Sequence, residues 1–167
     1  MGGRAGSATQ EQTLFSQTTE YAMRAMAWLA LSPDVLVSTL TLAEKTKVPP
    51  HYLAKVLQQL SAAELIVGRR GVRGGYKLSR PAKQISLLDV VRAVADVQRI
   101  TACPLGLATH GPNLCPLHKR VDQAAKAVID TYGSVTLQDL VNDQQGPKPL
   151  CDTEPAMAKL TVSAAKR

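Results

Sequence analysis

The chain has 167 residues, of which 45% are hydrophobic, and this is enough for one buried core with an appendage. Lysine and arginine (20) outnumber aspartate and glutamate (13), so the net charge is +7, which favours a polyanionic partner such as nucleic acid. Three cysteines without a secretory signal segment argue against a secreted disulfide scaffold, and the longest apolar stretch, residues 25–31, is too short to cross a bilayer. We therefore expect a cytoplasmic protein without membrane association.

Both ends of the chain have the composition of tails. Residues 1–12 are rich in Gly, Ser, Thr and Gln without helical periodicity, and residues 142–167 mix charged residues with three prolines. In contrast, apolar residues recur throughout residues 18–32, which predicts a well-buried first helix.

The next segment predicts two helices joined by a tight turn. Thr41 and Glu44 fit a capping box, and the prolines at 49 and 50 suit the start of the second helix. In that helix four apolar residues form an inward stripe at helical spacing: Leu53, Val56, Leu57 and Leu60. The remaining face offers candidate DNA contacts: His51, Tyr52, Lys55 and Gln59. This arrangement is typical of a helix-turn-helix.

A basic hairpin is predicted directly afterwards. Residues 66–67 and 76–78 are β-prone and flank a glycine-rich turn. The turn carries three arginines as candidate DNA contacts: Arg69, Arg70 and Arg73. Arginine at a hairpin tip can enter a narrow minor groove or bridge phosphates, although a charged hairpin can also be a merely solvated one. Because this hairpin directly follows a predicted helix-turn-helix in the sequence, we interpret it as the wing of a winged helix.

Two cysteines and two histidines follow within the segment "CPLGLATHGPNLCPLH". Cys115 precedes Pro116, and therefore should lie at a helix N-terminus, where the helix dipole stabilises negative charge. Apolar residues at 117, 121, 124 and 128 have heptad-like spacing, which predicts a long helix to about Tyr132. Thiolates with imidazole suit both iron–sulfur clusters and zinc, so the residue types alone leave the ligand open.

The segments "EYAMRAMAWLA", "LAEKTKVPPHYLAKVLQQLSAAELIVGRRGVRGGYKLSRP" and "ISLLDVVRAV" resemble, in order, the Rrf-type (IscR/NsrR-like) family of bacterial transcription regulators. The resemblance extends from about Leu14 to Leu140. It implies a mainly α fold with a small β wing, built as a winged helix-turn-helix plus a long dimerisation helix. It also implies a homodimer that binds a double-stranded DNA operator under the control of a cluster, another ligand or a thiol state. The sequence contains neither a phosphate-binding loop nor a nucleophile elbow, so we do not expect an enzyme.

The resemblance also suggests metal ligands. Cys103 is similar to the first family cysteine and Cys115 to the last, whereas Thr109 stands near the middle position with His110 beside it. Glu20, directly before "YA", matches an acidic position that in some members reaches the cluster of the other subunit.

Each of the added ligand candidates has a simpler interpretation. Glu20 also fits a carboxylate stabilised at a helix start, His110 a surface loop residue, and His118 a first-turn residue without ligand duty. Cys151 lies in the tail, outside the motif, and is expected to be a surface thiol.

Three hypotheses follow for this segment. The first is an iron–sulfur cluster held by Cys103, Cys115 and a non-cysteine ligand such as Glu20 or His110. A 2Fe–2S cluster is favoured, with 4Fe–4S as the alternative. The second is structural zinc, for which Cys103, His110, Cys115 and His118 form a four-ligand set. The third is a thiol switch in which Cys103 and Cys115 form a disulfide.

We expect five regions along the chain. They are a flexible N-terminal tail (1–13), the winged helix-turn-helix domain (14–98), the cysteine-containing cluster loop (99–115), the dimerisation helix with the segment after it (116–141), and a flexible C-terminal tail (142–167).

Overall fold

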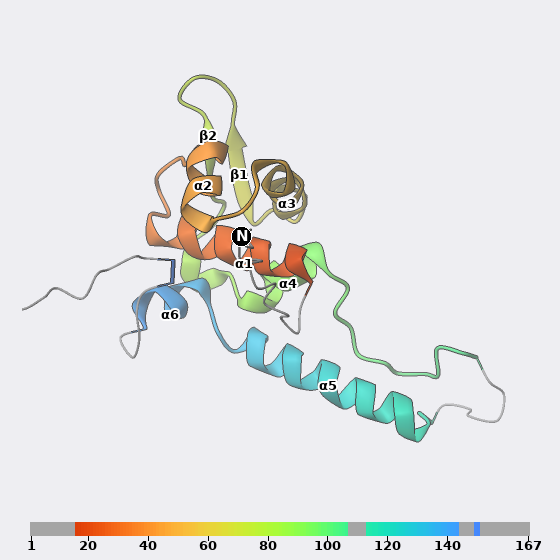
Figure 1. The fold of residues 1–167 in the computed structure, drawn as a ribbon. Helices are drawn as coiled ribbons and strands as arrows, with labels where there is room; N and C mark the ends of the chain where they lie inside the picture. Colours follow the sequence, from red (N-terminus) through yellow and green to blue (C-terminus); the bar gives the residue numbers. More distant parts are fainter. Residues whose placement is uncertain (1–15, 107–112, 144–148, 151–167) are drawn as a thin grey trace, which may run out of the picture.

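The computed structural model describes residues 16–106, 113–143 and 149–150, and it is mainly helical with one small sheet (Figure 1). Its elements in chain order are α1 (Gln17–Leu31), α2 (Thr39–Thr46), α3 (Pro50–Ala62), β1 (Ile66–Arg69), β2 (Gly75–Leu78), the short 3-10 helix η1 (Ala82–Gln84), α4 (Leu87–Val94), α5 (Pro116–Gly133) and α6 (Leu137–Asn142). The expected mainly α fold with a β wing is confirmed.

The first helix lies at the centre of the core. Ala22, Ala25, Met26 and Leu29 of α1 are fully buried, and α1 packs against α2, α3, α4 and α6. Ser16 caps the helix, because its side chain accepts a hydrogen bond from the Thr19 amide at 3.2 Å. A helix that is apolar on most sides needs neighbours on most sides, and the fold supplies them.

The helix-turn-helix is formed by α2 and α3. The buried residues of α3 are the four of the predicted stripe: Leu53, Val56, Leu57 and Leu60. The predicted capping box at Thr41 and Glu44 is wrong, because α2 begins one turn earlier and Ser38 caps it by accepting from the Thr41 amide at 3.1 Å. Pro49 and Pro50 stand at the start of α3, as expected.

The wing is the antiparallel hairpin of β1 and β2, in which Ile66 pairs with Leu78 and Arg69 with Gly75. Strand β2 is attached through Tyr76 to Val37, the residue before the α2 cap. Val37 donates to the Tyr76 carbonyl at 2.9 Å and Tyr76 donates to the Val37 carbonyl at 2.8 Å. The wing and the N-terminus of α2 therefore form one continuous surface.

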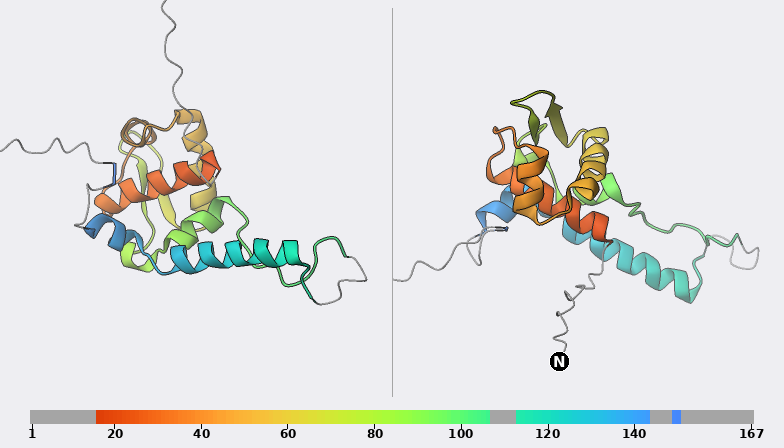
Figure 2. Two further views of the ribbon diagram at one scale, coloured as in Figure 1. Left: turned by 60° about the horizontal axis from the view of Figure 1, so that its bottom comes forward. Right: turned by 45° about the horizontal axis from the view of Figure 1, so that its top comes forward.

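The long helix α5 leaves the body of the molecule at one end (Figure 2). Its C-terminal end is tied back, because Leu87 of α4 donates to the Val135 carbonyl and Leu137 of α6 donates to the Ile85 carbonyl, both at 2.9 Å. Leu137 is fully buried in the core. The predicted helix from Pro116 to about Tyr132 is confirmed, and its N-terminal end projects from the body with the segment that precedes it.

Within the described residues, every helix is too short or too polar to span a lipid bilayer. The expected N-terminal tail and most of the expected C-terminal tail lie outside the described residues.

Candidate cysteine–histidine site and DNA-binding face

The first turn of α5 places a thiol beside an imidazole. Cys115 is the N-cap residue, with an extended backbone (φ −65°, ψ 163°), and His118 is the third residue of the helix. Side chains at these two positions approach each other, because the N-cap side chain turns back over the first turn. The Cys115 sulfur lies 3.3 Å from His118 Nδ1.

Cys103, which lies on the irregular segment between α4 and α5, also approaches His118 Nδ1. It begins a tight turn in which the Gly106 amide donates to the Cys103 carbonyl at 3.0 Å, with Gly106 in the left-handed region (φ +61°). Cys103 is buried, and its sulfur lies 3.8 Å from His118 Nδ1. The structure thus brings Cys103, Cys115 and His118 together, and His118 is more closely involved than the sequence suggested.

The described residues do not contain a complete metal site. In residues 16–106 and 113–143, no three side chains of the types His, Cys, Asp and Glu stand in an arrangement that could hold a metal ion. His110, Thr109 and Cys151, which the sequence analysis also considered, lie outside the described residues.

Glu20 is not brought to this cluster within the protomer. It lies in the first turn of α1 and accepts a hydrogen bond from Arg24 Nε at 2.8 Å. Its charge contributes to the raised pKa of Tyr132, whose main cause is burial, so Glu20 lies near the far end of α5. That end is about 24 Å from Pro116 along the helix. A ligand role for Glu20 therefore requires a second subunit and stays a prediction.

An ion pair that the sequence did not suggest joins the cysteine loop to α5. Arg99 donates through Nε and Nη2 to the two oxygens of Asp122, both at 2.6 Å, and the Ile100 amide donates to Asp122 Oδ1 at 3.0 Å. The Arg99 guanidinium is the main cause that lowers the pKa of Asp122 to about 2. Nothing in the residue types marks this pair, since the two residues are far apart in sequence and similar charges occur all along the chain.

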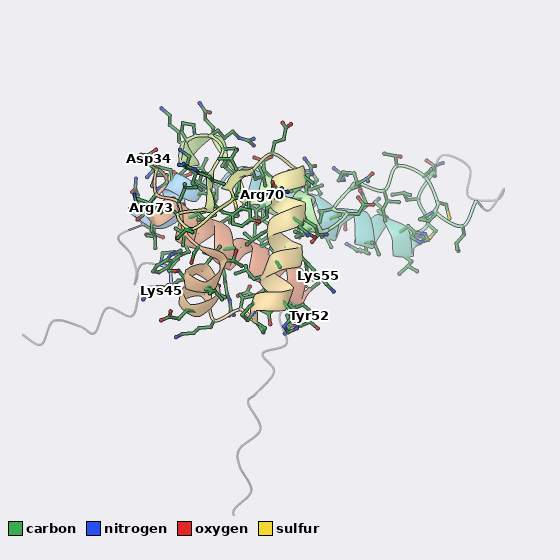
Figure 3. All side chains as sticks on the ribbon, turned by 90° about the horizontal axis from the view of Figure 1, so that it is seen from above. Asp34, Lys45, Tyr52, Lys55, Arg70 and Arg73 are labelled. Atoms are coloured by element: carbon green, nitrogen blue, oxygen red, sulfur yellow. The ribbon has the colours of Figure 1, made fainter. Side chains whose placement is uncertain are left out.

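The outer face of α3 is available to a partner. His51, Tyr52, Lys55 and Gln59 are all exposed. Figure 3, which views the molecule from the wing side, shows Tyr52 and Lys55 on this face of α3. The Tyr52 ring contacts His51, with ring centroids 4.5 Å apart, and meets Tyr21 of α1 edge-on at 6.2 Å. These contacts orient the N-terminal end of α3 on the core.

The wing supplies positive charge to the same side. Arg69, Arg70 and Arg73 are exposed, and Arg70 and Arg73 appear with Lys45 of α2 in the view of Figure 3. A cleft of about 430 Å³ lies along the wing, with the start of α2 and Ser61 of α3 forming the rest of its lining. Its lining includes Ser38, the N-cap of α2, and Thr39, the first residue of α2, neither of which was predicted from the sequence. The capping pattern at Ser38 was the signal that could have indicated them.

A protein-family model supports the same interpretation over most of the chain. The Rrf2 model, described as an iron-dependent transcriptional regulator, matches residues 15–143. The chain belongs to the Rrf2 family. A protein of Aquifex aeolicus (strain VF5), named as a putative HTH-type transcriptional regulator, is 30% identical to this chain over 135 residues. The match covers 79% of this chain and 94% of the Aquifex protein. The Rrf2 family and this relative are transcriptional regulators, not enzymes, as expected.

Solved structures agree with the Rrf2 assignment. The structure of T. potens IscR has a TM-score of 0.65 and 22% identity, covering 84% of this chain and 96% of that one. The oxidised form of Staphylococcus aureus CymR has a TM-score of 0.62 and 26% identity, covering 80% of this chain and all of that one. The protein is therefore a DNA-binding transcriptional regulator with a winged-helix fold.

Proposed function

We propose that this Rrf2 protein is a homodimer whose affinity for an operator is controlled by an iron–sulfur cluster bound at Cys103, Cys115 and His118. The observation that carries the proposal is the approach of both sulfurs to one imidazole nitrogen, at 3.3 and 3.8 Å. Thiolate and imidazole are the ligands that iron–sulfur clusters take in proteins. The description of the family as iron-dependent adds support.

The ligand set needs one more member. A 2Fe–2S cluster takes four protein ligands, whereas the described residues bring three side chains near one another without the arrangement that would hold a metal ion, so cluster binding would also have to rearrange them. We propose that the fourth comes from Glu20 of the second subunit or from His110. A 4Fe–4S cluster with fewer protein ligands is the alternative.

The exposed face of α5 supports the homodimer. Leu117 and Val121 are 67% and 45% exposed on a helix that projects from the body, and Ala124 and Val128 continue their row toward the anchored end. Such an apolar row at heptad-like spacing fits a second copy of the same helix. Two recognition helices in one dimer would then meet successive major grooves of an operator. Because that operator is part of a bacterial genome, we infer that the protein works in the cytoplasm.

The packing offers a route from the cluster to the DNA. The C-terminal end of α5 is hydrogen-bonded to the start of α4 through Val135 and Leu87, and α4 packs against α3. A change at the N-terminal end of α5 that tilts the helix would therefore act on the recognition helix through α4.

A thiol switch is the second candidate, and the same geometry favours it. Both sulfurs lie within 3.8 Å of one imidazole nitrogen, and the histidine can accept a proton when an external oxidant takes two electrons from the thiol pair. One of the similar structures is an oxidised form, that of S. aureus CymR. A structural zinc ion bound to the same residues is a further outcome for the experiment to distinguish.

The deciding experiment is purification without air, followed by a visible absorption spectrum and assays of iron, sulfide and zinc. The cluster proposal expects iron and sulfide in equal amounts, together with loss of visible absorption in Cys103→Ala, Cys115→Ala and His118→Ala. Cys151→Ala and His51→Ala are the matched controls, since they remove the same residue types elsewhere, and both should keep the spectrum. Zinc without sulfide would support the structural site, whereas a metal-free protein that forms a Cys103–Cys115 disulfide would support the thiol switch.

A further inference from the structure

The carboxylate of Asp122 is the one buried charge in the part of the chain that the structure describes. It accepts two hydrogen bonds from the Arg99 guanidinium and one from the Ile100 amide. The other ion pairs on α1 and α5, Arg24–Glu20 and Lys126–Asp130, are i, i+4 pairs along a single helix. The pair of Arg99 and Asp122 instead joins two segments, and we refer to it as the clasp.

The clasp lies at the base of the cysteine loop. Arg99 is four residues before Cys103, and Asp122 is four residues after His118, one turn further along α5. Within the described residues, the hydrogen bonds that join residues 96–102 to α5 all end on the Asp122 carboxylate. The rest of this segment has no helix or strand that would fix its course.

We propose that Arg99 and Asp122 are positioning residues that hold the Cys103 thiol against Cys115 and His118. The proposal rests on the proposed function only in treating these three side chains as one site. Cys115 and His118 need no such help, because both belong to the first turn of α5. Cys103 arrives on an irregular segment, and the clasp fixes that segment to the same helix.

The Arg99–Asp122 ion pair is suited to holding the two segments together across the physiological pH range. A guanidinium that binds both carboxylate oxygens fixes direction as well as distance, which a lysine cannot do. The Asp122 carboxyl, with a pKa of about 2, stays ionised at every pH at which a cell lives. The clasp therefore holds the loop in place while the site itself reacts to its signal.

The test is the alkylation of each cysteine by iodoacetamide in the full-length, reduced, metal-free protein, followed by mass spectrometry of the peptides. The ratio of the Cys103 rate to the Cys115 rate is the readout. Arg99→Gln and Asp122→Asn should each raise this ratio about tenfold, because the buried Cys103 becomes exposed more often while Cys115 stays on its helix. General loss of stability would raise both rates together, and that result would overturn the proposal.

Three further variants make the test specific. Arg99→Lys keeps the positive charge but cannot bind both carboxylate oxygens, so it should give a ratio between those of the parent and Arg99→Gln. It also replaces Arg99→Gln in the test if that variant does not fold. The exchanged pair Arg99→Asp with Asp122→Arg should lower the ratio toward that of the parent. Lys126→Gln, which breaks an exposed ion pair on the same helix, should leave it unchanged. A parental ratio in both Arg99→Gln and Asp122→Asn, with native circular dichroism, would refute the clasp. Because no metal is present, this outcome is independent of whether a cluster binds.

Discussion

Replacing Gly75 by alanine should detach the wing from the start of α2. A Cβ atom at this position would stand 2.4 Å from the Val37 carbonyl oxygen and 2.6 Å from the Val37 carbonyl carbon. Both are backbone atoms, so no side-chain rotation can relieve the contact. The β2 strand must move away, and the two hydrogen bonds between Val37 and Tyr76 must lengthen.

The cost can be worked out from these contacts. Forcing one extra carbon into a filled space costs about 1–3 kcal/mol, and each of the two weakened backbone hydrogen bonds adds about 0.5–1.5 kcal/mol, so we expect a loss of about 2–6 kcal/mol. The loss should be greatest at the end of the wing nearest the turn, because the other end is held in the core by the buried Ile66 and Leu78. The affinity for duplex DNA should fall as well, since the wing arginines would no longer lie at a fixed distance from α3.

Urea denaturation gives the free energy of unfolding, and hydrogen exchange of the Val37 and Tyr76 amides reports the attachment itself. Val72→Ala is the matched control, because Val72 is fully exposed in the wing and its truncation removes no packing. A Gly75→Ala protein with parental stability, to within about 0.5 kcal/mol, and parental protection of both amides would refute this account of the wing.

Four further predictions concern other parts of the molecule. Leu57→Ala should lower the free energy of unfolding by about 2–5 kcal/mol in urea, since Leu57 is fully buried in α3; a smaller loss would contradict the assigned stripe. Val121→Asp should give a folded monomer in sedimentation experiments, and a persistent dimer would place the interface elsewhere. The Asp122 carboxyl should titrate in NMR spectra near pH 2, and Arg99→Gln should raise its pKa toward 3.8. Because the folded pKa is the lower one, the ion pair stabilises the fold fully above pH 3.8 and loses this effect as the pH falls toward 2; an unshifted Asp122 would contradict the geometry. Arg70→Ala should reduce the slope of log affinity against log salt on non-specific duplex DNA by about one, and an unchanged slope would remove Arg70 from the DNA contacts.

The sequence by itself determined the elements whose residues carry a local signal. The stripe from Leu53 to Leu60 repeats at helical spacing, so it identified both the helix and its buried face. The glycines between the two β-prone stretches identified the wing, and Pro116 after Cys115 identified the start of α5. Each of these features depends on residues that are close in sequence, and for that reason it could be predicted without the fold.

The start of α2 shows where local signals were insufficient. Ser38 and Thr41 are both acceptable N-cap residues, and the sequence favoured Thr41 because Glu44 follows it. In the fold, the bridge between Val37 and Tyr76 holds the chain extended up to Ser38, which has φ −66° and ψ 152°. A contact with a strand almost forty residues away thus decided which residue caps the helix.

The candidate site was decided in the same way. The spacing of Cys115 and His118 could indicate their approach, because it is one helical turn, but the place of Cys103 beside them depends on the course of an irregular segment. That course is fixed by Arg99 and Asp122, two charged residues of common types whose pairing becomes visible only when the loop and α5 lie side by side. Charge pairs across a long loop leave no periodic pattern in a sequence, since many partners are equally possible until packing selects one.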